Sequence, residues 1–221
     1  MDFGVRARPK ALRKWPRLVD KVVLHVEKLV DRHRYRTWYE RADLTADWTS
    51  GNFPRWRRML GVWRDRPLRI LEIGTYEGRA SIFFLNFFPR STFVGIDWFE
   101  GELGTPAAAR LDHNMAPYSD RVEILKMDAV AALEQLASAQ RKFDLIYIDV
   151  SHYYGIAKAT TRAAWSLTVP GSVVIWDDYA WGHDLPPEQR GATAIDEFLR
   201  ERDGSYRVLG SGYQLAVERC R

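Results

Sequence analysis

Residues 69–78 read Arg-Ile-Leu-Glu-Ile-Gly-Thr-Tyr-Glu-Gly, and this stretch decides the fold. The run from Arg69 to Ile73 is typical of a buried strand, because most of its residues are large and apolar. Gly74 and Gly78 then allow the backbone to turn sharply, since glycine adopts conformations that other residues rarely reach. A helix is expected from about Arg79 to Phe88. The stretch therefore predicts a strand, a glycine loop and a helix in succession.

The rest of the 221-residue chain repeats this alternation. Further strands are expected at 92–96, 122–126, 143–148, 172–176, 206–209 and 213–217, and further helices at 108–115, 129–139, 156–167 and 192–202. Strands that alternate with helices imply right-handed crossovers and a mainly parallel sheet, and the last two strands can pair as a hairpin. The predicted fold class is α/β, with a doubly wound, mainly parallel, seven-stranded sheet.

Acidic residues occupy the ends of these strands or the positions directly after them. In a doubly wound sheet, ligands bind beyond the carboxyl ends of the strands, so polar side chains there are the first candidates for function. The residues placed in this way are Glu72, Asp97, Asp128, Asp149, Asp177 and Asp178.

The N-terminal part of the chain differs from the rest in charge. Residues 1–68 hold 17 Lys/Arg against 8 Asp/Glu, a net charge of +9, whereas residues 69–221 hold 16 against 21, a net charge of −5. A basic segment can meet an anionic partner, including an anionic membrane surface. The simpler interpretation is a solvated helix that packs on the domain by its apolar side.

Two helices are expected in this segment, over about 15–39 and 53–63, the second with Pro54 as its first residue. The segment 1–66 is therefore predicted to be a basic helical addition that serves as a lid or as a dimer contact in a homo-oligomer. Residues 67–221 are predicted to form the functional domain.

Composition excludes several classes of protein. The single cysteine, Cys220, rules out an internal disulfide. No apolar run approaches the roughly 18–20 residues of a membrane span, and the basic N-terminus is not followed by the apolar stretch of a signal peptide. A cytoplasmic location is the expectation.

The glycine loop is not a dinucleotide motif. It reads Glu72-x-Gly74-x-x-x-Gly78, and Tyr76 stands where a middle glycine would relieve crowding against a pyrophosphate. Asp97 follows the second strand, 23 residues after Gly74, at a distance typical of a carboxylate that accepts from ribose hydroxyls. Tyr76 therefore argues against a nicotinamide cofactor, although the loop could also be a plain strand-to-helix turn and Asp97 a helix cap.

Met127-Asp128-Ala129 follows the third predicted strand. There the Asp128 carboxylate and the Ala129 amide could contact an adenine edge, but Asp128 also stands where a helix N-cap is expected.

These motifs follow three consecutive predicted strands. In this arrangement the sequence resembles the class I S-adenosylmethionine-dependent methyltransferases, which have a Rossmann-like fold. Within them it most closely resembles the macrocin O-methyltransferase group of sugar-modifying enzymes. The resemblance covers roughly residues 68–218 and rests on the stretches 70–80, 93–97, 143–154, 170–179, 194–199 and 212–215. It implies that S-adenosylmethionine is the cofactor, that Asp97 binds the ribose, and that Asp128 and Ala129 contact the adenine. Glu72 and Gly74 would line the methionine part. The other candidates for cofactor binding are Thr75, Tyr76, Gly78, Trp98 and Asp149.

Asp149, Asp177 and Asp178 end two strands that are expected to be neighbours, about 4.8 Å apart. Close carboxylates repel one another unless a proton or a cation neutralises them, and oxygen ligands suit Mg²⁺. The resemblance implies a metal at these three positions. The alternative is that one aspartate contacts the cofactor and the others cap a loop.

His152 lies three residues after Asp149. Its usual pKa of about 6.5 suits a base that takes the proton of an acceptor hydroxyl. The alternative is an orienting role through a hydrogen bond to Asp149 or Asp177. In the resembled group a glycine is usual where this chain has Val150.

The predicted function is S-adenosylmethionine-dependent O-methylation of a hydroxyl group on a small molecule or sugar, with His152 and Asp149 at the reacting centre. Aromatic residues in the irregular segments could contact the acceptor, namely Trp98, Phe99, Tyr153, Tyr154, Tyr179 and Trp181, with His183 among them. The alternatives are a nucleic-acid methyltransferase, which an Asn-Pro-Pro-Tyr-like element would have favoured, and a cofactor-binding protein without catalysis.

Overall fold

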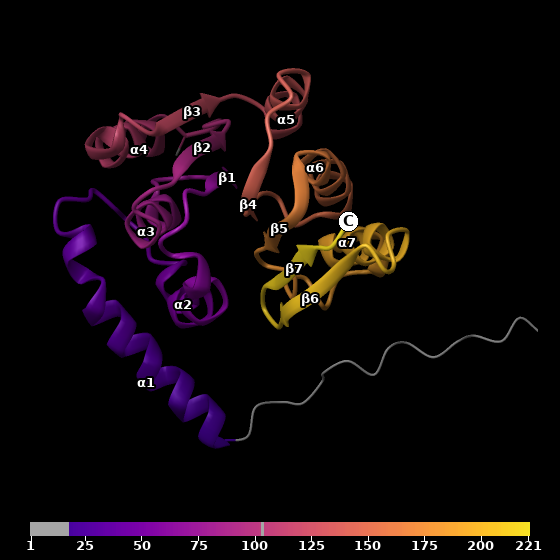
Figure 1. The fold of residues 1–221 in the computed structure, drawn as a ribbon, viewed down its shortest axis with the longest axis horizontal. Helices are drawn as coiled ribbons and strands as arrows, with labels where there is room; N and C mark the ends of the chain where they lie inside the picture. Colours follow the sequence, from indigo (N-terminus) through magenta and orange to yellow (C-terminus); the bar gives the residue numbers. More distant parts are fainter. Residues whose placement is uncertain (1–17, 103) are drawn as a thin grey trace, which may run out of the picture.

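The computed structural model describes residues 18–102 and 104–221, with the side chains of residues 18–24 left out. The start of the helix predicted from residue 15 lies outside the described residues. The fold is built on one seven-stranded sheet in the order β3-β2-β1-β4-β5-β7-β6 (Figure 1). The first five strands run parallel and the last two are antiparallel, which confirms the predicted mainly parallel sheet. The strands are β1 (Arg69–Ile73), β2 (Thr92–Asp97), β3 (Val122–Lys126), β4 (Phe143–Ile148), β5 (Thr168–Trp176), β6 (Tyr206–Ser211) and β7 (Leu215–Arg219).

Helices cover both faces of this sheet. In Figure 1 the sheet is seen nearly edge-on, with α2, α3 and α4 on its left and α5, α6 and α7 on its right, while α1 extends away from the body. The helices are α1 (Leu18–Arg34), α2 (Phe53–Leu60), α3 (Arg79–Phe87), α4 (Gly104–Met115), α5 (Ala129–Ser138), α6 (Tyr154–Ser166) and α7 (Gly191–Arg200).

Alternation along the strands divides the core into two layers, because successive side chains of a strand point to opposite faces. Ile70 of β1 and Tyr147 of β4 pack on the α2–α3 side with Phe83 and Trp56, all fully buried. Leu71 of β1 packs on the other side, in the cluster that includes residues of α5, α6 and α7. The central strands β1 and β4 are therefore buried on both faces, as is typical of a parallel sheet.

Two elements begin four residues earlier than predicted. The helix expected from residue 108 begins at Gly104, because Pro106 falls in its first turn, where a missing N–H costs nothing. The strand expected from residue 172 begins at Thr168, before the glycine and proline. Pro170 and Gly171 are accommodated by a register shift against β4, and Ser172 Oγ bridges it by accepting from the N–H of Val169 and donating to the O of Phe143.

The expectation that the first helix packs its apolar side on the domain is wrong for the part whose side chains are described. Val26, Leu29 and Val30 of α1 are about half exposed, whereas Asp31 is fully buried. The reason is electrostatic: Asp31 and Glu27 face Arg57 and Arg58 of α2 and form ion pairs with them. Within the described residues, no helix combines the length and apolar character that a membrane crossing needs.

Gly74 is the position where this fold depends most on a missing side chain. Its φ is +92°, and a Cβ atom added there would lie 1.8 Å from the backbone O of Asp149. We expect Gly74→Ala to lower the free energy of unfolding by about 2 kcal/mol or more, since left-handed strain alone costs about 1–3 kcal/mol and the clash adds to it. Urea unfolding followed by circular dichroism measures this change.

The matched control is Gly155→Ala, in the first turn of α6, where an added Cβ meets nothing within 4 Å. That variant is expected to unfold like the wild type or slightly later, because alanine is the better helix former. Equal losses in both variants would contradict the assigned role of Gly74.

Candidate functional site

The glycine loop joins the carboxyl ends of three strands. The N–H of Gly74 donates to the backbone O of Ile96, the next-to-last residue of β2, at 2.8 Å. The N–H of Asp149, directly after β4, donates to the O of Ile73 at 2.7 Å. The ends of β1, β2 and β4 therefore meet at this loop, which is where a sheet of this topology binds its ligands.

Asp97, at the end of β2, is oriented by the loop. Its Oδ2 accepts from the N–H of Tyr76 at 2.7 Å, and its Oδ1 accepts from the N–H of Phe99 at 3.3 Å. Tyr76 has φ +46°, an uncommon conformation for a residue with a side chain. Each carboxylate oxygen can accept a further hydrogen bond, so Asp97 keeps acceptor capacity for a ligand. Trp98, beside it, is 55% exposed.

Two polar groups are buried under the loop. Glu72 is fully buried, and its Oε2 accepts from the Ser81 hydroxyl at 2.7 Å. Burial raises the pKa of Glu72 well above its usual value, and the nearby charges of Asp149 and Asp97 add to the shift, while the Ser81 hydrogen bond opposes it. Thr75 is also buried, and its Oγ1 has no hydrogen-bond partner in the described part of the chain. An orphaned buried hydroxyl of this kind is a mark of a group that a ligand can satisfy.

The remaining loop candidates also have structural roles. Asp128 caps α5, since its Oδ1 accepts from the N–H groups of Val130 and Ala131 at 3.0 Å each. Ala129 is the first residue of that helix. Gly78 precedes α3 with φ +87°, and a Cβ there would lie 2.8 Å from Leu111. An adenine contact at Asp128 and Ala129 therefore stays a prediction, and the alternative of a helix cap is observed.

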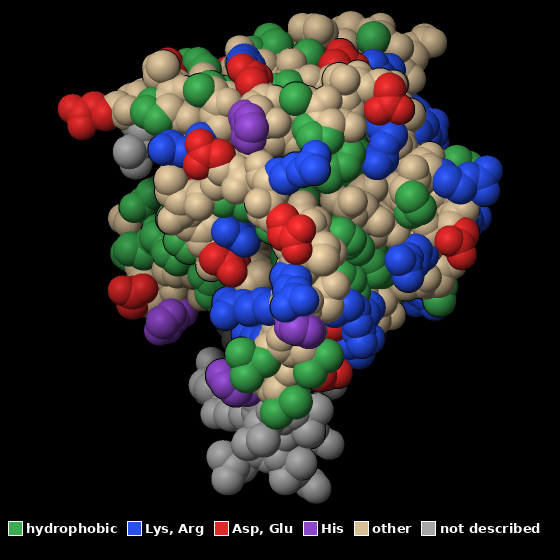
Figure 2. Space-filling model, turned by 90° about the vertical axis from the view of Figure 1, so that its left-hand side faces the viewer, with side chains coloured by type: hydrophobic (Ala, Val, Ile, Leu, Met, Phe, Trp, Pro, Cys, Tyr) green, Lys and Arg blue, Asp and Glu red, His purple; other side chains and the backbone are tan. Residues whose placement is uncertain are grey.

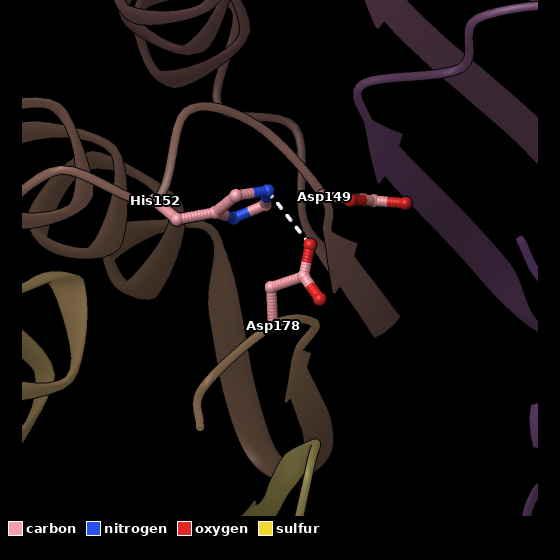
Figure 3. Close-up of side chains that lie close together, drawn as sticks. All are labelled: Asp149, His152 and Asp178. Atoms are coloured by element: carbon pink, nitrogen blue, oxygen red, sulfur yellow. Dashed lines mark ion pairs between the residues drawn. The ribbon is translucent and has the colours of Figure 1, made fainter. Parts of the chain in front are cut away.

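An acidic cluster with one histidine lies at the same edge of the sheet. Asp149 follows β4, Asp178 follows β5, and His152 stands on the loop before α6. Ligand atoms of these three residues lie within 4.8 Å of one another, and Figure 3 shows the three side chains converging. His152 Nε2 lies 2.7 Å from Asp178 Oδ2. The arrangement can hold a cation or a shared proton.

Asp177, the third predicted metal ligand, is not part of that set. Its Oδ2 accepts from the hydroxyl of Tyr147, and its Oδ1 accepts from the N–H of Asp178 at 2.8 Å. The Tyr147 hydroxyl also lies 3.2 Å from Asp149 Oδ2, so one fully buried tyrosine contacts two of the carboxylates. Sequence reasoning missed Tyr147, although its position two residues before Asp149 carries a signal: in a strand, alternate residues point the same way.

The charges of the cluster shift its pKa values. Burial, followed by the charges of Asp177 and Asp178, raises the pKa of Asp149 to about 7. Burial alone would lower the pKa of His152, but its hydrogen bond to Asp178 and the three nearby carboxylates outweigh burial and raise it. Asp178 keeps a lowered pKa because its hydrogen bonds to His152 and Tyr213 outweigh the effect of burial. The cluster therefore carries excess negative charge that a proton or a cation relieves.

The N-terminal segment, which the sequence predicts to be a lid or a dimer contact, reaches into this region. Glu77 of the glycine loop is buried and accepts from the N–H and the hydroxyl of Thr45, both at 2.6 Å. Trp48 stacks on Tyr76 with ring centroids 5.3 Å apart, while 76% of its surface stays exposed. The segment around residues 43–48 thus lies directly against the loop.

The predicted aromatic residues divide between two positions. Trp181 lies beside His152 and Tyr153, with ring centroids at 5.5 and 5.4 Å. The hydroxyls of Tyr154 and Tyr179 instead donate to Glu197 and Asp196 of α7, at 2.6 Å each. Trp181 and Tyr153 are therefore the aromatic residues placed to meet a ligand at the acidic cluster.

Residues 71–179, which contain the loop, Asp97 and the acidic cluster, match the family described as "Methyltransferase domain". This stretch of the chain is therefore a methyltransferase domain of that family. The matched residues run from β1 to the end of β5, so the family covers the parallel part of the sheet, and β6, β7 and the N-terminal segment complete this methyltransferase outside it.

Solved structures agree with this assignment at the level of the fold. MycE methyltransferase of the mycinamycin biosynthetic pathway, in complex with Mg, S-adenosylhomocysteine and mycinamycin VI, is 18% identical with a TM-score of 0.63; the match covers 88% of this chain and 54% of MycE. The O-methyltransferase TomG of Streptomyces achromogenes, in complex with S-adenosylmethionine, is 21% identical with a TM-score of 0.59, over 88% of this chain and 89% of TomG. A Bacillus cereus O-methyltransferase is 21% identical with a TM-score of 0.59, over 91% of this chain and 97% of that enzyme.

This methyltransferase therefore spans about half the length of MycE. Among curated proteins, none matches its sequence significantly.

The shifted pKa values predict how stability of the metal-free methyltransferase depends on pH. A carboxyl whose pKa rises on folding binds more protons in the folded state between its unfolded pKa and about 7, so stability falls as pH rises through that window. A histidine with a raised pKa acts in the same direction, because its contribution is lost as pH rises through the folded value. We expect the free energy of unfolding in EDTA to fall between about pH 5 and pH 8.

Urea titrations at several pH values measure this slope. Asp149→Asn removes one of the responsible groups, so the variant should show a flatter profile than the wild type over the same range. Parallel profiles for the two proteins would contradict the assignment of the shift to Asp149.

Proposed function

We propose that this methyltransferase transfers the methyl group of S-adenosylmethionine to a hydroxyl group of a small molecule or sugar, with a divalent metal ion at the acidic cluster. The observation that carries the proposal is the meeting of the glycine loop and the cluster of Asp149, His152 and Asp178 at one edge of the sheet. Gly74 and Asp149 are in backbone contact there, so a methyl donor and a hydroxyl acceptor can lie side by side.

The residues around the loop fit the cofactor. The buried Glu72 carboxyl and the orphaned Thr75 hydroxyl can receive polar groups of its methionine part. Asp97 can accept from the ribose hydroxyls while it holds the N–H of Tyr76. Asp128 and Ala129 remain the candidates for the adenine. When bound, the cofactor supplies a methyl group on an already activated sulfonium, so the protein's contribution is alignment and removal of a proton.

The donor set also fits a cation. Asp149 and Asp178 supply oxygen ligands, and the raised pKa of Asp149 reflects negative charge that a cation would neutralise. With Asp177 as the third ligand, the set is all oxygen and suits Mg²⁺. With His152 in its place, a nitrogen ligand favours a transition metal. When bound, the ion lowers the pKa of an acceptor hydroxyl and fixes its orientation. Magnesium in MycE supports the first set.

His152 is proposed as the base or the orienting residue. Its Nε2 contacts Asp178, which supports an orienting role. Because Nε2 donates to the Asp178 carboxylate, a proton taken from a hydroxyl would be held at Nδ1, and the charge of Asp178, which raises the pKa of His152, would stabilise the protonated ring. Trp181 and Tyr153 would then flank the acceptor, and a flat apolar side chain is a usual surface for a sugar ring.

The N-terminal segment is proposed to act as a lid or as a dimer contact. The contacts of Thr45 and Trp48 with the glycine loop support a lid. The outward apolar side of α1, with Val26, Leu29 and Val30, supports a contact with a second copy.

Asp97→Ala tests the cofactor assignment. We expect the affinity for S-adenosylhomocysteine, measured by calorimetry, to fall roughly 10-fold to 100-fold, because hydrogen bonds to a charged group contribute about 1.5–3 kcal/mol each. The control is Asp112→Ala, an exposed carboxylate paired only with Lys126 among the described residues, which should leave the affinity unchanged. Unchanged binding in both variants would refute the role of Asp97.

Metal removal and His152→Ala test the reaction centre. With methyl-labelled cofactor and a panel of hydroxylated acceptors, EDTA should abolish turnover and Mg²⁺ should restore it. His152→Ala should cut turnover by about 100-fold or more if the histidine is a base, with cofactor affinity nearly unchanged.

Metal titration of the variants separates the roles. If His152 is a metal ligand, His152→Ala should weaken metal binding as much as Asp149→Asn does. If His152 is a base or an orienting residue, Asp149→Asn should weaken metal binding and His152→Ala should not. Full activity in chelator would reject the metal.

A further inference from the structure

A hollow lies at the opposite end of α3 from the glycine loop. It has a volume of about 490 Å³ and lies between the end of α1, the α2 region and Phe87, the last residue of α3. That volume is within the range of about 300–1,000 Å³ found for small-molecule sites. Because α3 begins directly after Gly78 and has nine residues, the hollow lies on the order of 13 Å along the helix axis from the loop.

Three guanidinium groups line the hollow. Arg34 and Arg57 are held in place by the fully buried Asp31, with Nη1 of Arg34 at 2.7 Å and Nε of Arg57 at 3.0 Å from its oxygens. A guanidinium has five N–H donors, so both keep donors for a ligand after pairing with Asp31. Preorganised arginines of this kind bind carboxylate or phosphate with little loss of side-chain freedom.

The third guanidinium, Arg64, is exposed and forms no ion pair with any carboxylate in the described part of the chain. Its Cζ lies 5.6 Å from the ring centroid of Phe87. It is therefore the arginine most available to an anion. Figure 2, which views the side of the molecule that α1 crosses, shows several Lys and Arg side chains gathered on the lower half of this face.

Flat rings complete the walls. Trp38 stacks on Tyr35 with centroids 4.3 Å apart and keeps part of its surface accessible. Phe87 and Tyr35 are buried beneath the hollow, so Trp38 is the ring that keeps accessible surface there. Gly61 contributes no side chain, and a Cβ atom added there would meet nothing within 4 Å, so the hollow is open at this residue.

We propose that this hollow binds a small organic anion that carries a flat ring, either an aromatic carboxylate or a nucleoside monophosphate. The guanidiniums match the anionic group, and the accessible surface of Trp38 together with the plane of Arg64 matches the ring by stacking and cation–π contacts. The site is separate from the proposed methyl-transfer site, whose own charges are predominantly negative, so it does not depend on the proposed function.

Calorimetric titration tests the proposal with 2-naphthoate, adenosine monophosphate and inorganic phosphate. Saturating S-adenosylhomocysteine is present throughout, so that adenosine monophosphate cannot report on the cofactor site. One or both ring-bearing anions should bind with one-to-one stoichiometry. The anion that binds more tightly shows whether the hollow prefers an aromatic carboxylate or a nucleoside monophosphate. Phosphate should bind much more weakly. Absence of binding by both ring-bearing anions, or equal binding of phosphate, would overturn the proposal.

Two variants locate the binding in the hollow. Arg64→Gln should weaken it about 10-fold or more, the usual loss for a charge-assisted hydrogen bond. Gly61→Phe should fill the hollow and abolish binding, and it is expected to fold because Gly61 has φ −58° and open space. Arg66→Gln, outside the lining, should bind like the wild type.

Binding retained in Gly61→Phe would overturn the proposed location. Thermal unfolding without ligand confirms that the variants are folded, and affinity for S-adenosylhomocysteine should be the same in all of them.

Discussion

The backbone contact between Gly74 and Asp149 is the constraint on which the rest of the site depends. With no Cβ, Gly74 brings the end of β1 against the carbonyl of Asp149 at the end of β4. The same residue donates its N–H to β2, so three strand ends are fixed by one turn. Everything with proposed chemistry is arranged around this point: the loop that follows β1, the carboxylate that ends β2, and the acidic cluster that follows β4 and β5.

This closeness has an electrostatic consequence. The fold buries Glu72 completely and crowds Asp149, Asp177 and Asp178 at one edge, which raises the pKa values of the first three. Like charges at close range destabilise a protein unless something compensates them. In the described part of the chain, hydrogen bonds from Tyr147, Ser81, His152, Tyr213 and Gln214 do so. Residues that cost stability in this way are characteristic of functional sites, where a ligand supplies the missing compensation.

The N-terminal segment contributes to the same region instead of standing apart from it. Trp56 of α2 is fully buried, packs edge-on against Tyr147 and donates to Gln214 Oε1 at 3.0 Å. Thr45 satisfies both oxygens of Glu77. The rings of Tyr147 and Tyr76 thus each rest on a tryptophan from this segment, so its described part from Tyr35 onward helps to support the site. Only α1, with its inward acidic and outward apolar sides, reaches beyond the body.

The sequence by itself determined the order of strands and helices, the predominantly parallel sheet and the edge at which polar residues gather. Those features follow from local periodicity and glycine placement, which need no knowledge of distant contacts. Tertiary structure decided which acidic residues converge: Asp178 joins Asp149 and His152, while Asp177 turns to Tyr147. It also decided that α1 buries Asp31 and exposes Val26. The ion pair between Asp31 and Arg57 of α2 sets which side of α1 faces the domain, and the apolar spacing along the helix does not. Pairings between side chains distant in sequence depend on the packed fold, and no local pattern encodes them.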